Sequence, residues 1–183
     1  MPELAARFQA MVPEAAFAPE YRCRPAEARD QPGIETLHDT AFGPGALTRT
    51  AYRIREGRPV RSPYCRVIEA DGAVVAFSRC TLVRIGGERG GLLLGPVAAG
   101  ADHANRGLAR RAILEGLSAA ITDGLSIAVL VGDLGYYGRL GFVPVAPGRM
   151  ALPGPVDLQR LLAIELQPDA LARYGGPITG DDA

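Results

Sequence analysis

The sequence of 183 residues contains neither lysine nor tryptophan, so all 20 of its basic residues are arginines. Without lysine, the chain can hold neither the lysine of a Walker A phosphate loop nor a lysine that forms a Schiff base with a substrate. The 20 arginines are balanced by 20 acidic residues. This even balance indicates neither a nucleic-acid partner nor a membrane partner.

Cysteine is also scarce, with only Cys23, Cys65 and Cys80 present. The number is odd and no two cysteines form a C-x-x-C pair, so we expect neither a disulfide framework nor a structural metal site. No apolar run approaches the ~20 residues needed to span a bilayer. The first twenty residues lack the basic start and apolar core of a signal peptide. We therefore expect a cytoplasmic protein.

Length and composition favour one domain, because 48% hydrophobic residues suffice for a sizeable core. We expect the domain proper at residues 21–167. Residues 1–20 are predicted to form an N-terminal helix or arm, in which apolar residues share one helical face before Pro13. Residues 168–183 are predicted to form a loose C-terminal tail.

The central part of the chain, residues 90–142, predicts a βαβ unit. A strand is expected at Leu92–Ala99, and from Leu108 to Gly124 apolar residues recur at the spacing of one buried helical face. Ser126–Val131 is an uninterrupted apolar run of strand length, typical of a strand covered on both faces. The crossover of such a unit is nearly always right-handed.

The first strand of this unit is interrupted by Gly95 and Pro96. Proline has no amide hydrogen for a strand ladder, and glycine favours a bulge. We therefore expect free backbone groups near Val97, although a simple bulged strand fits the same residues.

A hairpin is predicted upstream, with strands at Tyr64–Ala70 and Ala73–Ile85 around Asp71-Gly72. A further glycine-rich turn leads into the strand at Leu92. An antiparallel meander followed by a βαβ unit predicts an α/β fold with a mixed sheet.

Four further elements are expected outside the meander and the βαβ unit. They are a strand at Tyr21–Pro25, helices at Ala26–Phe42 and Ala46–Glu56, and a last strand at Leu161–Leu166.

The turn at residues 104–110 has chemistry available at the start of the central helix. The first amides of a helix have no intrahelical partner and carry about half a positive charge. With Arg106 and Arg110 beside them, and Gly107 allowing close approach, these amides could hold a diphosphate. An ordinary strand-to-helix turn with surface arginines remains equally open.

Two motifs here resemble the GNAT (general N-acetyltransferase) superfamily. HANRGLAR is similar to its acyl-CoA-binding turn, usually Q/R-x-x-G-x-G/A, with Ala104 where Gln or Arg is usual and Ala109 at the second small position. VLVGDLGYYGRLGF resembles a later segment of one branch of predicted acetyltransferases. The resemblance covers Tyr21 to about Leu166. It implies a mixed, largely antiparallel sheet flanked by helices, with a central βαβ acyl-CoA-binding unit.

The resemblance further implies an enzyme that moves an acetyl group from acetyl-CoA directly to an amine. The acceptor, whether a small molecule or a peptide, stays open, as does a homodimer; the two early helices would shape the acceptor side. The residues expected to bind the cofactor are Val97, Ala98, Ala99, Ala104, Asn105, Arg106, Gly107, Leu108, Ala109 and Arg110.

Tyr137 stands four residues before Gly141, at the position of the family's usual acid, and would protonate the departing thiolate. A buried tyrosine with a purely structural hydroxyl is the alternative. We expect Tyr136 to serve packing and Asp133 to cap the next turn.

No general base can be identified, and ordered water would serve as the proton relay. The acidic and histidine candidates are expected to be solvated or structural. They are Glu35, His38, Asp39 and Glu69. His103, beside the diphosphate turn, could contact phosphate or face water, and we expect it to face water. Cys80 is expected to be a small buried residue without a nucleophilic role.

Two other functions fit parts of the sequence. A non-catalytic GNAT-like module that binds CoA or a partner would be consistent with the altered Ala104. A dinucleotide-binding domain also places a glycine turn before a helix, but this chain lacks a full G-x-G-x-x-G after a first strand.

Overall fold

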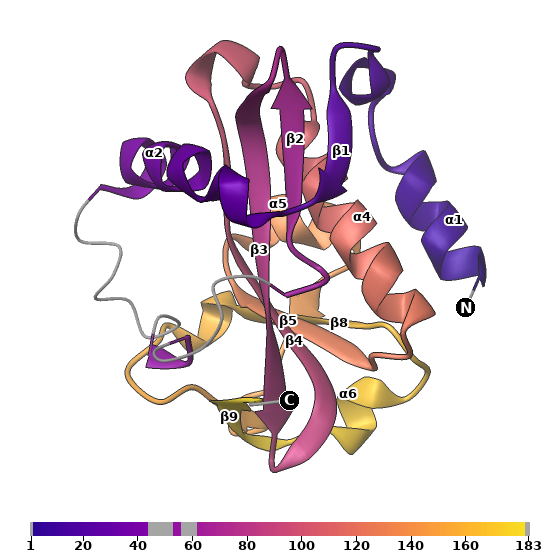
Figure 1. Cartoon of the computed structure of the whole chain (residues 1–183). Coiled ribbons are helices and arrows are strands. Elements are labelled where there is room, and N and C mark those ends of the chain that lie inside the picture. The colour runs from indigo at the N-terminus through magenta and orange to yellow at the C-terminus, as the bar shows by residue number, and fades with distance from the viewer. Residues whose placement is uncertain (1, 44–52, 56–61, 182–183) are drawn as a thin grey trace.

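The computed structural model describes residues 2–43, 53–55 and 62–181. Within them, nine strands follow the order β1-β2-β3-β4-β5-β8-β6, and β9 pairs with β3 and β7 (Figure 1). Every strand pair is antiparallel except β4 with β5 and β7 with β9. The predicted mixed, largely antiparallel sheet flanked by helices is therefore confirmed.

Most of the predicted strands and helices are present, with ends that differ by a few residues, whereas β6, β7, β9 and α6 were not predicted. The strands are β1 Arg22–Pro25, β2 Arg66–Ala70, β3 Ala73–Ile85, β4 Glu88–Ala99, β5 Ile127–Val131, β6 Val143–Pro144, β7 Met150–Ala151, β8 Leu161–Glu165 and β9 Gly176–Gly180. The α-helices are α1 Pro2–Ala10, α2 Gln31–Phe42, α4 Leu108–Thr122, α5 Leu134–Tyr137 and α6 Ala170–Arg173. Short 3-10 turns are η1 Glu14–Phe17, η2 Ala28–Asp30, η4 Ala101–His103, η5 Gly138–Leu140 and η6 Leu158–Arg160.

The hairpin between β2 and β3 forms at the predicted dipeptide. Asp71 and Gly72 both have positive φ angles, 50° and 77°. Two consecutive positive φ angles match the right-handed twist of the strands in a two-residue hairpin, and Asp-Gly adopts them at low cost. The local sequence therefore sets the register of this hairpin.

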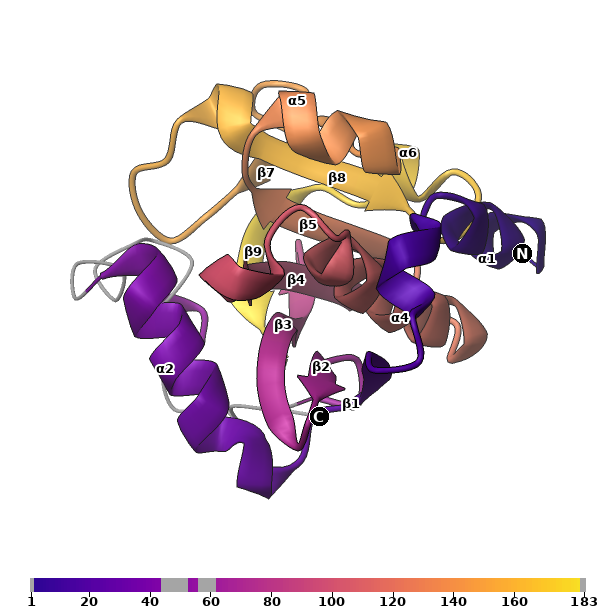
Figure 2. The same cartoon turned by 90° about the horizontal axis from the view of Figure 1, so that it is seen from above.

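Two helices cover opposite faces of the sheet (Figure 2). On one face, α4 packs against alternate residues of the strands, including Ile68 and Ala76. On the other, α2 packs through Ile34 and Leu37 against their neighbours Val67 and Phe77. Because side chains alternate across a strand, adjacent residues of β2 and β3 belong to different cores.

The backbone of α4 comes very close to the chain before β2. A Cβ atom added to Gly116 would lie 2.6 Å from the carbonyl oxygen of Tyr64. Gly116 is buried within the helix, where glycine otherwise lowers helix stability. Close packing of α4 on the sheet therefore accounts for a glycine at this place.

The predicted loose tail at residues 168–183 is wrong for the part that the structure describes. Residues 170–173 form α6, and β9 pairs with the far end of β3, where Ile85 lies opposite Ile178. Because β3 is much longer than β2, its last residues present a free strand edge, and β9 pairs with that edge.

The two helices predicted within residues 26–56 are described only in part. The first helix begins at Gln31, later than the predicted Ala26, and Pro32 sits in its first turn, where the missing amide hydrogen costs nothing. The predicted helix at Ala46–Glu56 lies outside the described residues except for residues 53–55.

Of the helices that the structure describes, none is long and apolar enough to cross a membrane.

Candidate functional site

Strands β4 and β5 pair over only a short stretch and then separate. The pairing joins Gly91–Leu93 to Ile127–Val129. Beyond it, β4 continues to pair with β3 and β5 with β8. Among the described residues, no strand pairs with the edge of residues 94–99 that faces β5. The interruption of the strand by Gly95 and Pro96 had predicted free backbone groups at this edge.

The bulge lies in β4, as expected from Gly95 and Pro96. Val97 pairs with Ser78 and Leu94 pairs with Cys80, so β4 advances three residues while β3 advances two. Gly95 has a φ of 109°, a conformation that side chains disfavour. One extra residue therefore bends β4 at the point where it leaves β5.

Beside this edge, α4 begins with its first amides free. Gly107 is the N-cap residue with a φ of 79°, and no side chain caps the helix. Within the described chain, no protein group accepts a hydrogen bond from the amides of Leu108, Ala109 or Arg110. Such amides, together with the helix dipole, favour an anion.

A pocket of about 440 Å³ opens between the end of β4, the first turn of α4 and α5. Six of the ten predicted cofactor residues line it: Ala99, Asn105, Gly107, Leu108, Ala109 and Arg110. Pro13, His103 and Tyr136 also line the pocket, and none of them was predicted to do so.

The other four predicted cofactor residues lie outside the pocket lining. Ala98 is buried on the α2 face of the sheet, because side chains alternate along β4. Val97 packs against the core under α4. Ala104 is exposed, and Arg106 lies over the ring of Tyr21, 5.9 Å from its centroid. Any contact that these residues make with a cofactor would use the backbone or need a side-chain movement.

Known structures share this fold. A GNAT family N-acetyltransferase (YhbS) from Escherichia coli, in complex with CoA, has a TM-score of 0.76 and 25% identity, covering 89% of this chain and 91% of that one. A GNAT family acetyltransferase from Brucella melitensis, in complex with acetyl-CoA, has a TM-score of 0.58 and 29% identity, covering 79% and 95%. No family model and no curated protein matches the sequence.

The chain has the fold of these GNAT family acetyltransferases and is similar to them in sequence. A more distant neighbour is the ribosomal-protein-S18-alanine N-acetyltransferase from Escherichia coli, with a TM-score of 0.56 and 16% identity, covering 80% of this chain and 94% of that one. At this identity the likeness shows the shared fold alone. The GNAT resemblance is confirmed at the level of the fold, and the role of each residue is a separate question.

Tyr136 was expected only to pack, but in this GNAT fold its side chain also lines the pocket. Its side chain is 38% exposed and lines the pocket. Burial of part of the ring raises the pKa of Tyr136, and the nearby Arg110 guanidinium opposes the rise. The expectation of a packing role is therefore incomplete, because the short helix α5 turns this tyrosine towards α4.

Tyr137 lies next to the pocket but does not line it. Its ring packs edge-on against Phe142, with centroids 5.8 Å apart, and lies against Gly132, where a Cβ atom would be 2.4 Å from the ring. Burial raises the pKa of Tyr137 to about 12. The role as acid stays a prediction.

Asp133 has the capping role predicted for it. Its Oδ1 atom accepts a hydrogen bond from the amide of Tyr136 at 2.9 Å, at the start of α5. This bond fixes the direction in which the tyrosine turn leaves β5.

His103 was expected to face water, and the structure places it in the wall of the pocket. The side chain is half-buried, lines the pocket and has its Nδ1 atom 3.1 Å from the hydroxyl of Tyr21. The two rings are nearly perpendicular with centroids 5.8 Å apart. Tyr21 precedes β1 and is far away in sequence, so no local pattern could have shown this pair.

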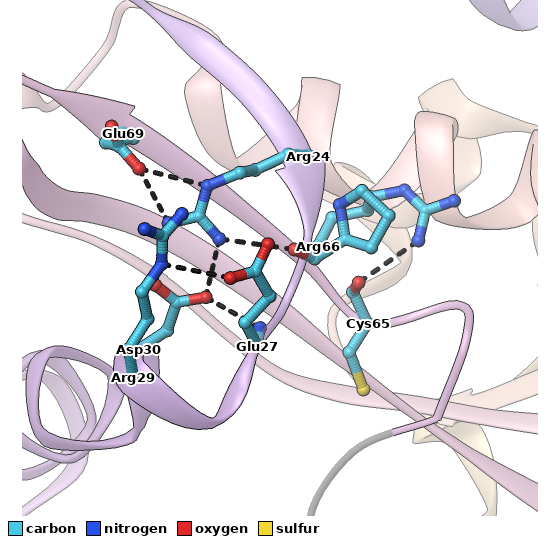
Figure 3. A network of polar contacts seen from close by, with 8 residues as sticks. Arg24, Glu27, Arg29, Asp30, Cys65, Arg66 and Glu69 are labelled. Carbon is cyan, nitrogen blue, oxygen red and sulfur yellow. Dashed lines mark hydrogen bonds and ion pairs between the residues drawn. The ribbon is translucent and has the colours of Figure 1, made fainter.

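The candidate bases are occupied by other contacts, as Figure 3 shows for Glu69. The guanidinium of Arg24 binds Glu69 at 2.6 Å and, on its other side, Asp30 at 2.6 Å. Hydrogen bonds from Arg24 hold the pKa of both carboxyls below the usual range. Glu35 accepts a hydrogen bond from Gln31, one turn earlier in α2. None of the four candidate bases, Glu35, His38, Asp39 and Glu69, lines the pocket.

Cys80 is fully buried, as predicted, and burial raises the pKa of its thiol. Its amide donates to the sulfur of Cys65 at 3.3 Å. A thiol that resists ionisation is a poor nucleophile. No group of three or more metal-ligating side chains occurs in the part of the chain that the structure describes.

Proposed function

We propose that this protein is an acyl-CoA-dependent N-acetyltransferase that moves an acetyl group from acetyl-CoA to an amine. One observation carries the proposal: the pocket extends from Ala99, at the end of the free β4 edge, to the uncapped first turn of α4. The neighbours in complex with CoA and with acetyl-CoA support it, since both cover most of this chain. The acceptor is proposed to be a small-molecule or peptide amine.

In this account the diphosphate of acetyl-CoA accepts hydrogen bonds from the amides of residues 108–110. Gly107 presents no side chain that would block their approach. Because these contacts come from backbone, the alanine at position 104 removes only one side-chain contact. The pantetheine arm, which carries its own amides, is proposed to lie along the free edge of β4 as an added strand would.

The thioester would then lie near Val97–Ala99, where β4 has β3 on one edge and no strand partner on the other, and an amide on the unpaired edge would polarise its carbonyl. The amine nitrogen attacks the carbonyl carbon, the carbon–sulfur bond breaks, and the thiolate takes a proton. We propose Tyr137 as the donor of that proton, since its raised pKa keeps the hydroxyl protonated at neutral pH. The amine loses its proton to water, and water returns a proton to the tyrosinate, so that the net reaction forms amide and thiol.

We propose the cytoplasm as the location. The three cysteines are free in the structure, and Cys65 and Cys80 are in contact without a disulfide. Reduced thiols are the rule in the cytosol.

Calorimetric titration tests the cofactor assignment, with acetyl-CoA as ligand and NAD as the control. We expect saturable binding of acetyl-CoA and no binding of NAD, because the chain lacks the full dinucleotide glycine pattern. Thiol release from acetyl-CoA over a panel of amines then tests the reaction. Binding without thiol release for any amine would favour a non-catalytic module, which the position of Tyr137 outside the pocket also allows. Absence of acetyl-CoA binding would contradict the proposal.

A further inference from the structure

The N-terminal arm, residues 2–20, lies along α4 (Figure 1). Phe8 of α1 and Ala16 of η1 are fully buried in the same core as α4. The arm is thus a packed part of the molecule. Its exposed residue Pro13, between α1 and η1, lines the pocket.

Two consecutive arginines at the start of α4 hold the arm in place. Arg110 donates from Nη1 to the carbonyl of Met11 at 3.2 Å. Arg111 donates from Nη1 to the carbonyl of Ala16 at 2.7 Å, and its guanidinium lies over the ring of Phe17, 4.6 Å from the centroid. Charged donors on carbonyl acceptors make strong hydrogen bonds. The arm and the first turn of α4 therefore form one rigid wall.

Pro13 lies directly against Gly107. A Cβ atom added to this glycine would lie 2.2 Å from the Cγ atom of Pro13. Gly107 is the N-cap residue of α4, immediately before the three free amides. Any ligand group that those amides hold must therefore pass beside the ring of Pro13.

We propose that the arm is part of the acyl-CoA site and that Pro13 packs beside the phosphate-bearing nucleotide end of the cofactor. This inference rests on the proposed function. Proline suits the position because it is uncharged and has no amide hydrogen left without a partner. The arm then contributes to cofactor affinity and has no part in the chemistry at the thioester.

Replacing Pro13 with glutamate tests the inference. A carboxylate beside the phosphates repels them, so we expect Pro13→Glu to raise the Kd for CoA about tenfold relative to the control Pro13→Gln. Glutamine has the shape of glutamate without its charge. A second control, Gln9→Glu, adds the same charge to an exposed position of the arm that does not line the pocket. It should leave the Kd unchanged.

Acetyl-pantetheine, which has the thioester but no nucleotide or phosphate, separates the two ends of the site. The kcat/KM of Pro13→Glu with this substrate should equal that of Pro13→Gln. Thermal unfolding of each variant shows that the fold is intact.

The outcomes distinguish the inference from the function on which it rests. Equal Kd values for Pro13→Glu and Pro13→Gln, in a protein that binds CoA, would overturn the inference alone. A loss with acetyl-pantetheine as large as that with acetyl-CoA would also overturn it. If the unchanged protein binds neither CoA nor acetyl-CoA, the proposed function fails and the inference fails with it.

Discussion

Replacing Tyr137 with phenylalanine is expected to lower kcat for acetyl transfer about 100-fold, the usual contribution of a general acid. The Kd for acetyl-CoA should stay within about twofold of the value for the unchanged protein. The reason is that the Tyr137 hydroxyl acts only in the transition state, so its loss leaves ground-state binding of the cofactor unchanged. The ring would keep its packing on Phe142 and Gly132, so the fold should be unaffected. Steady-state kinetics and calorimetry on the same preparation provide both quantities.

Tyr136→Phe is the matched control, because this tyrosine lines the pocket and its neighbour does not. We expect it to change cofactor affinity more than kcat. The pKa of about 12 for Tyr137 adds a pH test. An acid with that pKa stays protonated, so loss of its proton should not lower kcat between about pH 7 and about pH 9. If Tyr136→Phe lowers kcat and Tyr137→Phe leaves kcat unchanged, then Tyr136 and not Tyr137 is the proton donor.

Replacing Arg24 with methionine is expected to destabilise the protein by about 3–5 kcal/mol, the usual cost of breaking a buried ion pair. The change removes the guanidinium that binds Asp30 and leaves that carboxylate, which is 3% exposed, without its counter-charge (Figure 3). For a chain of this size such a loss lowers Tm by about 10 °C. Differential scanning calorimetry measures the shift.

Arg29→Met is the control for this prediction. Arg29 pairs with Glu27 at 3.0 Å, but both side chains are more than half exposed. Exposed pairs of this kind contribute less than about 1 kcal/mol. Equal shifts in Tm for the two variants would contradict a structural role for the buried pair between β1 and the start of α2.

The same network predicts the direction of the pH dependence. The pKa values of Asp30 and Glu69 are lower in the folded state than the ordinary values for carboxyl groups. The unfolded chain therefore binds protons more readily than the folded one at acid pH. The stabilisation is complete above the ordinary carboxyl pKa values and is lost as pH falls through the lowered folded values. In Arg24→Met, this acid-side loss should become shallower.

The βαβ unit could be predicted from the sequence because its signals are local. The helical periodicity from Leu108, the apolar run of β5 and the Gly95-Pro96 interruption each act on neighbouring residues. The hairpin at Asp71-Gly72 is of the same kind. These elements place the free β4 edge beside the first turn of α4, which is most of the candidate site.

The missed features depend on contacts between distant parts of the chain. The pairs Tyr21 with His103 and Pro13 with Gly107 join segments more than eighty residues apart. No periodicity reports such pairs. The strand β9 was missed because it is short and begins with glycine and proline, which resemble a loop, and because it is stabilised by pairing with β3 and β7, which are distant in sequence.

The roles of the two tyrosines depend on a fine detail of the local geometry. Tyr136 and Tyr137 are neighbours on α5, a helix of four residues, so a small rotation decides which ring faces the pocket. The sequence motif favoured Tyr137 as acid, and the structure places Tyr136 on the pocket wall. Motif position and pocket geometry therefore supply two different candidates, which the paired phenylalanine variants separate.

A crystal structure of the protein with CoA tests the central claim most directly. We predict the diphosphate on the amides of residues 108–110, the nucleotide end beside Pro13, and the pantetheine arm along residues 94–99 of β4 with its sulfur near Tyr137. CoA bound elsewhere, or an occupied first turn of α4 with the pantetheine arm directed away from the opening between β4 and β5, would contradict the account.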